Sequence, residues 1–302
     1  MTRFKRVPLA TGVTLNVAVA GNPEKPPVIL LHGFPESHRT WREIVPRLQD
    51  SFYLLMPDQR GFAGSDLPQE VDDYKTDTLI DDIFALAQAY GLEKFALVGH
   101  DWGGAIAWGA ALRNDPRLTS LCIINAPHPV IFQASLFDSE EQRHASQYIT
   151  AFRAPGFEQA VEAMGFEAFF EKTFARHVDL SLIGEAERQQ YLADWSQPGA
   201  FNAMLNWYRA SRLVVPPVGV PVPRTVLRIF PRVKVPCLVI WGMKDAALLP
   251  LQLDGLEELV DNLAVVRLSD AGHFAPWEAG DQVARALQHF LTRQAAATAP
   301  GK

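Results

Sequence analysis

Short apolar runs alternate with longer segments of helical periodicity along the first third of the chain. A short apolar run bounded by turn residues is typical of a buried strand, whereas apolar residues three or four positions apart indicate a helix. Strands are predicted on this basis over 4–10, 13–20, 27–32, 52–57 and 95–98. Helices are predicted over 41–48, 78–90 and 105–112. Such alternation is typical of βαβ units and predicts a mostly parallel sheet, which the first two strands join as an antiparallel pair.

The same alternation returns near the end of the chain, after a long helical segment. Strands are predicted over 121–124, 237–241 and 264–268, and a closing helix over 281–292. Between them, helices are predicted over 158–176 and 186–195, with a capping box at 138–141 and an extended, proline-rich return at 214–223. The small, polar residues 294–302 predict a disordered tail. We therefore predict an α/β core with an eight-stranded sheet, built from residues 1–128 and 229–302, and an inserted helical cap over 129–228.

A sharp turn is predicted between the strand 95–98 and the helix that follows it. The connecting residues are Gly99-His100-Asp101-Trp102-Gly103-Gly104. Side chains at the three glycine positions would clash where the chain doubles back, so this turn can hold Asp101 exposed at the top of the sheet, as a nucleophile elbow does. No Gly-x-Ser-x-Gly occurs in the sequence. An aspartate is ordinarily ionised at neutral pH and can attack an electrophilic carbon directly, which gives an alkyl ester.

Hydrolysis of such an ester requires a base, a residue that orients the base, and hydrogen-bond donors beside the ester carbonyl. Asp245 follows the strand 237–241, and His273 follows the strand 264–268. Together with Asp101, they fall at three strand ends on the predicted active edge of the sheet. Asp270 is an alternative orienter, for which a loop or cap role is favoured. We expect His100 to point into the sheet in a structural role.

The donors are predicted in the segment 31–37, Leu-His-Gly-Phe-Pro-Glu-Ser, which follows a buried strand. The backbone N–H groups of Phe34 and Trp102 are predicted to form an oxyanion hole around the Asp101 carbonyl. Gly33 permits the close approach of the two segments. The bond before Pro35 is a candidate for the cis form, in an ordinary strand-to-loop turn that also aims these amides.

Composition and charge narrow the class of protein. The chain has 302 residues, 48% of them hydrophobic, and a net charge of −6 without a basic cluster, which argues against nucleic acid or a membrane surface as a partner. Neither a signal segment nor an apolar run of membrane-spanning length is apparent, so a cytoplasmic protein is expected. Cys122 and Cys237 are predicted to be buried free thiols. Neither a metal site nor a cofactor is expected.

These motifs resemble the α/β-hydrolase fold, and within it the epoxide hydrolases, over nearly the full length of the chain. The resemblance is carried by His-Gly-Phe-Pro-Glu-Ser at 32–37, Asp-Gln-Arg-Gly at 58–61, the elbow at 99–104, and Gly272-His273. It implies an aspartate nucleophile and two cap tyrosines that donate hydrogen bonds to the epoxide oxygen. Tyr148 and Tyr208 lie in sequence contexts similar to those of the soluble epoxide hydrolases. Tyr191, also in the predicted cap, is expected to be a packing residue.

The paired tyrosines have a chemical reason in epoxide opening. Charge develops on a poor alkoxide leaving group, and neutral phenols can stabilise or protonate it. An apolar substrate pocket is predicted from Phe34, Pro35, Trp102, Phe152, Phe169, Trp207 and Phe274. The predicted partners are therefore a small apolar epoxide and water. The oligomeric state, monomer or homodimer, stays open.

Three alternatives with the same fold are weighed against an epoxide hydrolase: two kinds of dehalogenase and a non-catalytic binding protein. Haloalkane dehalogenases share the aspartate elbow, but many have Asn at the position of Phe34, and a halide does not need the tyrosine pair. Fluoroacetate dehalogenases resemble this elbow but have Arg where Trp102 stands. Some relatives take their acid from the position of Asn125, which is not an acid here and so supports Asp245. A non-catalytic binding protein of this fold would commonly lack a member of the triad, and all three are present.

Overall fold

An eight-stranded sheet forms the centre of the protein in the computed structural model, which describes residues 2–222 and 231–298. The strands follow one another in space in the order β1-β2-β4-β3-β5-β6-β7-β8. Their bounds are β1 Arg3–Pro8, β2 Thr14–Ala20, β3 Pro27–Leu31, β4 Tyr53–Pro57, β5 Phe95–His100, β6 Leu118–Ile124, β7 Cys237–Gly242 and β8 Leu263–Leu268. The predicted eight-stranded, mostly parallel α/β sheet is confirmed.

Strand direction brings the functional loops to one edge of the sheet. β1 pairs antiparallel with β2, and β2 antiparallel with β4. The pairs β3–β4, β3–β5, β5–β6, β6–β7 and β7–β8 are all parallel. Because parallel strands end at the same edge, the loops after β3, β5, β7 and β8 lie close together. These are the loops on which the predicted catalytic residues lie.

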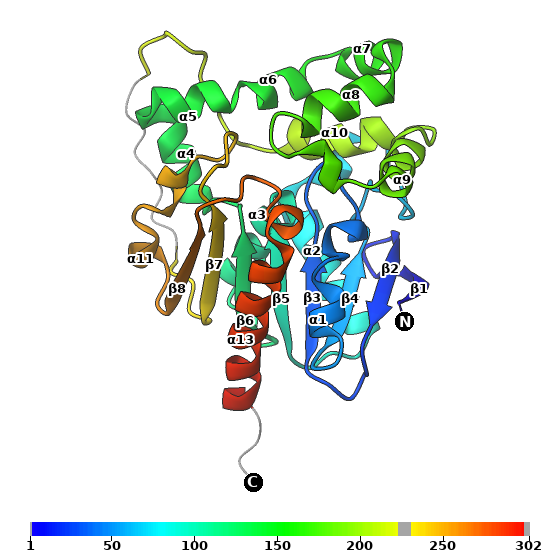
Figure 1. Ribbon diagram of the computed structural model, residues 1–302, viewed down its shortest axis with the longest axis vertical. Helices are drawn as coiled ribbons and strands as arrows, with labels where there is room; N and C mark the ends of the chain where they lie inside the picture. Colours follow the sequence, from blue (N-terminus) through cyan, green and yellow to red (C-terminus); the bar gives the residue numbers. More distant parts are fainter. Residues whose placement is uncertain (1, 223–230, 299–302) are drawn as a thin grey trace.

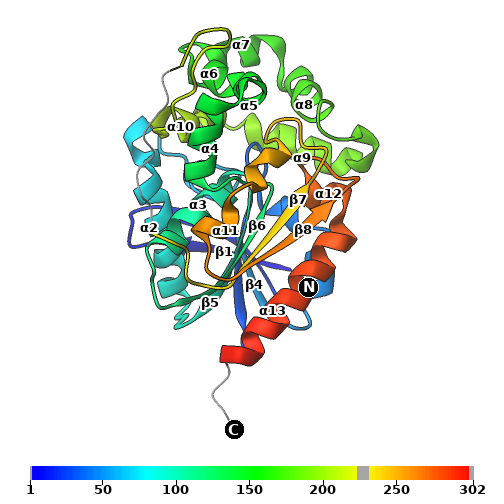
Figure 2. The same ribbon diagram turned by 90° about the vertical axis from the view of Figure 1, so that its left-hand side faces the viewer.

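Helices cover both faces of the sheet (Figures 1 and 2). Figure 2 shows α2 and α3 on one side of the sheet and α13 on the other. The core helices are α1 Val45–Leu48, α2 Thr76–Ala89, α3 Trp102–Leu112, α11 Leu256–Leu259, α12 Ala275–Glu278 and α13 Gly280–Thr298. Short 3-10 helices are η1 His38–Trp41, η2 Val71–Tyr74, η3 Leu180–Leu182 and η4 Pro250–Leu253.

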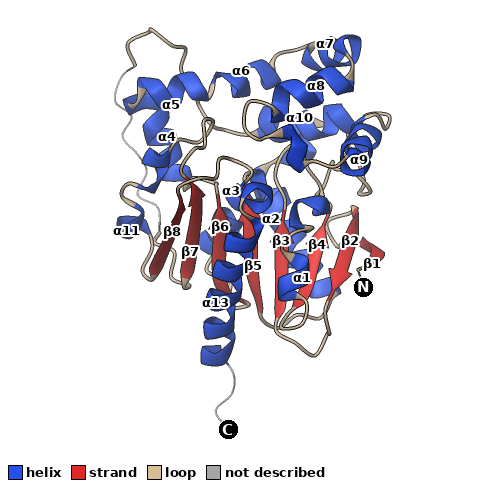
Figure 3. Ribbon diagram, viewed as in Figure 1, coloured by secondary structure: helices blue, strands red, loops and turns tan. Residues whose placement is uncertain are grey.

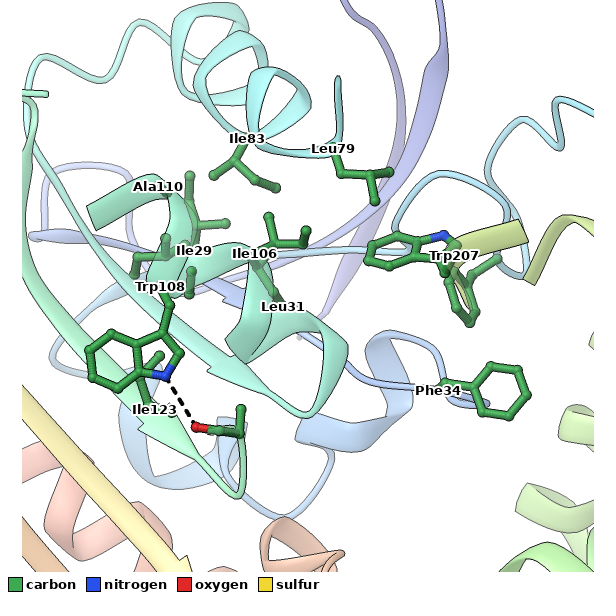
Figure 4. Packing of buried hydrophobic residues seen from close by; sticks show 14 of the residues in the cluster. Ile29, Leu31, Phe34, Leu79, Ile83, Ile106, Trp108, Ala110, Ile123 and Trp207 are labelled. Carbon is green, nitrogen blue, oxygen red and sulfur yellow. Dashed lines mark hydrogen bonds between the residues drawn. The ribbon is translucent and has the colours of Figure 1, made fainter. Parts of the chain in front are cut away.

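Alternate residues of each central strand enter two separate apolar layers. In β3, Ile29 and Leu31 belong to the layer under α2 and α3, and Val28 and Leu30 belong to the layer under α1 and α13. This explains why β3 has no polar face and why its sequence reads as a continuous apolar run. Figure 4 shows part of the first layer, in which the buried Trp108 of α3 donates its indole N–H to the Ala126 carbonyl at 3.1 Å. The helix that begins at the elbow is thereby fixed to the end of β6.

A helical insertion between β6 and β7 lies over the end of the sheet (Figure 3). Its helices are α4 Pro129–Asp138, α5 Glu140–Ala145, α6 Gln147–Arg153, α7 Phe157–Met164, α8 Phe166–Phe174, α9 Glu185–Trp195 and α10 Ala200–Ala210. This insertion is the predicted cap. Its proposed bounds, after residues 128 and 228, remain predictions, and residue 228 lies outside the described residues, as does Pro223 of the proline-rich return.

Several predicted helices differ from those observed. The helix predicted over 158–176 is two helices, because Gly165 between them has a φ of 90° that helical geometry does not allow. The segment 41–48 is α-helical only from Val45, after the 3-10 turn η1. The predicted disordered tail is wrong as far as Thr298, since α13 continues to that residue. Residues 299–302 lie outside the described range.

The capping box predicted at 138–141 is not formed as predicted, because the N-cap of α5 is Ser139, one residue later than Asp138. Ser139 caps α5 by accepting from the Gln142 amide at 3.2 Å. The Gln142 side chain does not return to Ser139 but donates to Ser146 and to the Ala247 carbonyl, which ties the cap to the core. The Gln142 side chain thus makes these two hydrogen bonds in place of the capping-box bond back to Ser139.

None of the described helices is long and apolar enough to cross a membrane.

Candidate active site

Asp101 occupies a strained turn between β5 and α3. Its φ of 50° and ψ of −121° are unusual for a residue with a side chain, and such strain often accompanies function. A Cβ at Gly99 would lie 2.4 Å from the Gly103 carbonyl oxygen, and one at Gly103 would lie 2.3 Å from the Leu31 carbonyl oxygen. A Cβ at Gly104 would meet the Ala126 Cβ at 2.3 Å. The elbow therefore needs glycine at all three positions, and it presents the Asp101 carboxylate above the sheet.

The loop after β3 supplies a hydrogen bond to this carboxylate. The Phe34 amide donates to Asp101 Oδ1 at 2.8 Å. A Cβ at Gly33 would lie 2.5 Å from the Asp101 Cβ, so glycine is required for this approach. The Phe34–Pro35 peptide bond is cis, as the sequence suggested. Trp102 begins α3 directly after Asp101, and the role of its amide as the second donor stays a prediction.

His32 holds the same loop from behind. Its Nδ1 donates to the Gly33 carbonyl at 2.9 Å, and its Nε2 accepts from the Gln59 amide at 3.0 Å. Burial lowers the pKa of His32, which keeps the ring neutral and in the tautomer that these two bonds require. The sequence motif contained His32, but only the structure shows that it orients the loop.

His273 lies between the two predicted aspartates. Its Nδ1 donates to Asp245 Oδ2 at 2.8 Å, and its Nε2 lies 3.6 Å from Asp101 Oδ2. Asp245 and His273 are both buried. Glu278 braces the loop, because its carboxylate accepts from the amides of Gly272 and Phe274 at 2.8 and 3.0 Å. The three predicted triad residues are thus brought together from the ends of β5, β7 and β8.

Asn125 is a site residue whose role the sequence does not reveal. In the sequence it marks only a position at which some relatives have an acid. In the structure its Nδ2 donates to Asp245 Oδ2 at 2.8 Å, and its Oδ1 accepts from the Gly242 amide at 2.9 Å. Asp245 Oδ1 accepts from the amides of Ala247 and Leu248, both at 2.9 Å. Both oxygens of the Asp245 carboxylate are therefore fixed by hydrogen bonds.

Charge around His273 outweighs the effect of its burial. Burial alone would lower the pKa of this imidazole, but the Asp245 carboxylate, with smaller contributions from Asp101 and Glu36, raises the pKa to about 9. For Asp245, burial acts to raise the pKa, but the contact with His273 and the hydrogen bonds from Leu248 and Asn125 lower it overall. The free site therefore favours an imidazolium between two carboxylates.

The other charged candidates take the structural places expected for them. Asp270 is exposed and binds Lys244 at 3.1 Å instead of His273. His100 is fully buried, and its Nε2 donates to the His273 carbonyl at 2.8 Å. Its Nδ1 lies 3.2 Å from a carboxylate oxygen of Glu36, which is also buried. In the sequence Glu36 is only part of the motif at 32–37, and nothing there indicates that its carboxylate lies beside His100.

Tyr148 and Tyr208 face the site from two different cap helices. Tyr148 lies on α6 and Tyr208 on α10, and their ring centroids are 6.2 Å apart. Burial raises the pKa of both phenols, and the negative charge of Asp101 raises each further. Both hydroxyls are therefore neutral and lie within the electrostatic reach of the Asp101 carboxylate. Tyr191, in contrast, packs against Phe170 and Trp277.

Four of the predicted pocket residues lie beside Tyr208 or His273. The rings of Phe34, Trp102 and Phe152 lie 5.0 to 5.1 Å from that of Tyr208. Phe274 packs directly against His273, at 4.9 Å. The other three are also buried, with Trp207 between Trp102 and Phe62, Phe169 against Trp195 and Phe201, and Pro35 in the loop after β3; their part in the pocket stays a prediction.

The described part of the chain contains no group of three or more His, Cys, Asp or Glu side chains arranged to hold a metal ion. Cys122 and Cys237 are buried free thiols, as predicted. Burial raises the pKa of Cys122 well above that of an exposed thiol, which makes it a poor nucleophile.

The fold and this arrangement define the class of protein. Residues 26–280 match the α/β-hydrolase fold family, and the chain belongs to that family. It is 34% identical over 285 residues to the AB hydrolase superfamily protein YfhM of Bacillus subtilis, with 94% of this chain and 96% of that protein covered.

Within the family, the chain is similar to epoxide hydrolases. A solved structure from metagenomes of hot environments, described as a novel epoxide hydrolase, is 46% identical, with a TM-score of 0.90 and 96% and 99% of the two chains covered. Epoxide hydrolase 3 of Xenopus tropicalis is 29% identical over 292 residues, with 93% of this chain and 75% of that protein covered. The predicted resemblance to the epoxide hydrolases is confirmed.

Proposed function

We propose that this protein hydrolyses an apolar epoxide to a vicinal diol through a covalent ester on Asp101. The observation that carries the proposal is the set of groups around the Asp101 carboxylate. One of its oxygens accepts from the Phe34 amide, the other faces His273, and two neutral cap phenols lie within its field. Similarity to epoxide hydrolases supports the same reaction.

In the first step, Asp101 attacks the epoxide. Oδ1 is held by the Phe34 amide, so Oδ2 forms the new bond to carbon. The carbon–oxygen bond of the ring breaks, and its electron pair goes to the ring oxygen. That oxygen takes a proton from one phenol of the pair Tyr148 and Tyr208 while the other donates a hydrogen bond. The products are a hydroxyalkyl ester of Asp101 and one phenolate.

In the second step, water cleaves the ester. His273, oriented by Asp245, removes a proton from water as the water oxygen bonds to the Asp101 carbonyl carbon. Negative charge develops on Oδ1, where the Phe34 amide and the Trp102 amide stabilise it. The ester oxygen leaves with the diol and takes its proton from His273. The carboxylic acid that forms then passes its proton to His273, which restores the Asp101 carboxylate and the imidazolium of the free enzyme.

The first step also prepares the histidine for the second. In the free enzyme two carboxylates favour the charged imidazole, with a pKa of about 9. Ester formation removes the negative charge of Asp101 beside Nε2. The pKa of His273 therefore falls, and its imidazolium gives a proton to the phenolate left by the first step, which restores the phenol. The neutral imidazole that can accept a proton from water is thus populated once the ester exists.

The tyrosine pair separates this reaction from the dehalogenation alternative. A halide is a stable anion and leaves without a proton, whereas an alkoxide must be protonated or strongly hydrogen-bonded as it forms. Two neutral phenols, one from α6 and one from α10, lie within the field of this carboxylate and suit protonation of an alkoxide. The apolar rings around them favour an apolar epoxide.

Two experiments test the proposal. We expect the double variant Tyr148→Phe, Tyr208→Phe to lose at least about a hundredfold in turnover of styrene oxide, since general-acid assistance contributes about that much. Tyr191→Phe is the matched control and should keep its activity. A single turnover in ¹⁸O-labelled water should place the label in Asp101 and not in the diol. Diol formed without label in Asp101 would rule out the ester.

A further inference from the structure

A cap residue outside the predicted site is bonded directly to the loop that carries the oxyanion donor. Trp195 is the last residue of α9, and its indole Nε1 donates to the Pro35 carbonyl at 2.8 Å. Its side chain is buried, with 2% exposed. Pro35 directly follows Phe34, whose amide binds Asp101 Oδ1. One hydrogen bond thus joins the cap to the residue beside the donor.

This hydrogen bond satisfies a buried backbone carbonyl of the loop after β3. Pro35 is buried and has no N–H group, so its carbonyl is the polar group that its backbone must satisfy. The Trp195 indole is the donor that the described structure provides for that oxygen. Without it, the buried carbonyl would be unpaired, and the loop would move to reach another donor or water. Such a movement would displace the Phe34 amide.

The indole itself is held rigidly. It stacks on Phe174 at 6.2 Å with 16° between the ring planes, and it contacts Phe170 and Tyr191 at 5.9 and 6.0 Å. The same helix is tied to the core at its other end, where the Arg39 guanidinium binds both oxygens of Glu187 at 3.0 and 3.1 Å. The packing of these rings therefore holds the indole N–H against the Pro35 carbonyl.

We propose that Trp195 is a positioning residue that sets the Phe34 amide for ester hydrolysis, so that the cap completes the oxyanion hole. This inference rests on the ester mechanism proposed above. The two steps of that mechanism depend differently on the amide. During attack on the epoxide the Asp101 carboxylate loses charge, so a well-placed donor on Oδ1 gives that step no advantage. During hydrolysis an oxyanion forms on Oδ1, and the donor stabilises the transition state.

The experiment compares Trp195→Phe with Glu187→Gln. The phenylalanine keeps an aromatic ring in the cluster and removes the N–H, whereas the glutamine weakens the other attachment of α9 and leaves the loop bond in place. Styrene oxide is the probe, and rapid quench with intact mass gives the rates of ester formation and loss. We expect Trp195→Phe to slow ester loss about tenfold or more, below the hundredfold effect of deleting an oxyanion donor outright. Its rate of ester formation should stay within about twofold of the wild type, and ester should accumulate.

Glu187→Gln should leave the partition between ester and free enzyme unchanged. A parallel loss of both rates in Trp195→Phe, or no change in either, would overturn the inference while the wild-type ester still supported the proposed function. A wild type that forms no ester would overturn the proposed function itself. If Trp195→Phe does not fold, the benzothienyl analogue of tryptophan at this position, with sulfur in place of N–H and the same ring shape, gives the same comparison.

Discussion

Removal of the Asp101 charge should lower the pKa of His273 in the folded protein. Asp101→Asn replaces the carboxylate by a neutral group of nearly the same shape, which makes it a stable imitation of the ester. His273 Nε2 lies 3.6 Å from Asp101 Oδ2, and the pKa of the imidazole in the free protein is about 9. The other carboxylate, that of Asp245, remains in place.

The size of the effect follows from this distance. Two unit charges about 4 Å apart interact by about 4 kcal/mol at an effective dielectric constant of about 20. One pKa unit corresponds to about 1.4 kcal/mol, so the upper limit of the shift is about 3 units. We expect the pKa of His273 to fall by about 2 units, to near neutrality, because relaxation of the site reduces the full Coulomb value.

The assay is an NMR titration of ¹⁵N-labelled histidine in the wild type and in Asp101→Asn, with His273→Gln used to assign the signal. Asp270→Asn is the matched control. It removes the same charge three positions from His273, but Asp270 is exposed and paired with Lys244, so no shift is expected. A His273 signal that titrates at the same pH in wild type and Asp101→Asn would refute the coupling between ester formation and base activation.

Three further predictions follow from the site. Gly33→Ala places a Cβ 2.5 Å from the Asp101 Cβ, so ester formation should fall at least about a hundredfold while circular dichroism stays unchanged; full activity would show that the loop is free to move. Asn125→Leu removes one of the donors to Asp245 Oδ2 and the acceptor of the buried Gly242 amide, and urea denaturation should show a loss of about 1 to 3 kcal/mol together with a lower kcat. For His273, whose pKa rises from 6.5 to about 9 on folding, the stabilisation is complete below about pH 6.5 and is lost as pH rises through 9. Between pH 6 and pH 10 the wild type should lose about 3 kcal/mol more unfolding free energy than His273→Gln, a comparison that cancels the other titrating groups, and equal changes in the two proteins would contradict the raised pKa.

The parts of the fold that the sequence predicts well are those in which local pattern and burial agree. The strand predicted at 27–32 matches β3 because both of its faces are covered, so its residues are continuously apolar. The elbow is equally predictable, since the close contacts at Gly99 and Gly103 demand glycine at those positions. The helical break at Gly165 was missed, because an isolated glycine within a helical pattern often remains helical.

The site residues that escaped prediction act through tertiary contacts. Asn125 and Glu278 bind atoms of the triad loops, but their types and spacing in the sequence carry no sign of it. Trp195 ends the helix predicted over 186–195, and only the position of α9 beside the loop after β3 reveals its hydrogen bond to the Pro35 carbonyl. Phe169 and Trp207 are predicted pocket residues that pack against Trp195 and Phe62, and their contact with substrate stays a prediction.

The most direct test of the central claim is the intact mass of His273→Gln after exposure to styrene oxide and, separately, to a 1-bromoalkane. This variant retains the nucleophile but lacks the base, so the ester should form and persist. A gain of the mass of the whole epoxide, mapped by peptide fragmentation to Asp101, is the predicted result. A gain of only the alkyl group from the bromide, with none from the epoxide, would contradict epoxide hydrolysis and favour a dehalogenase.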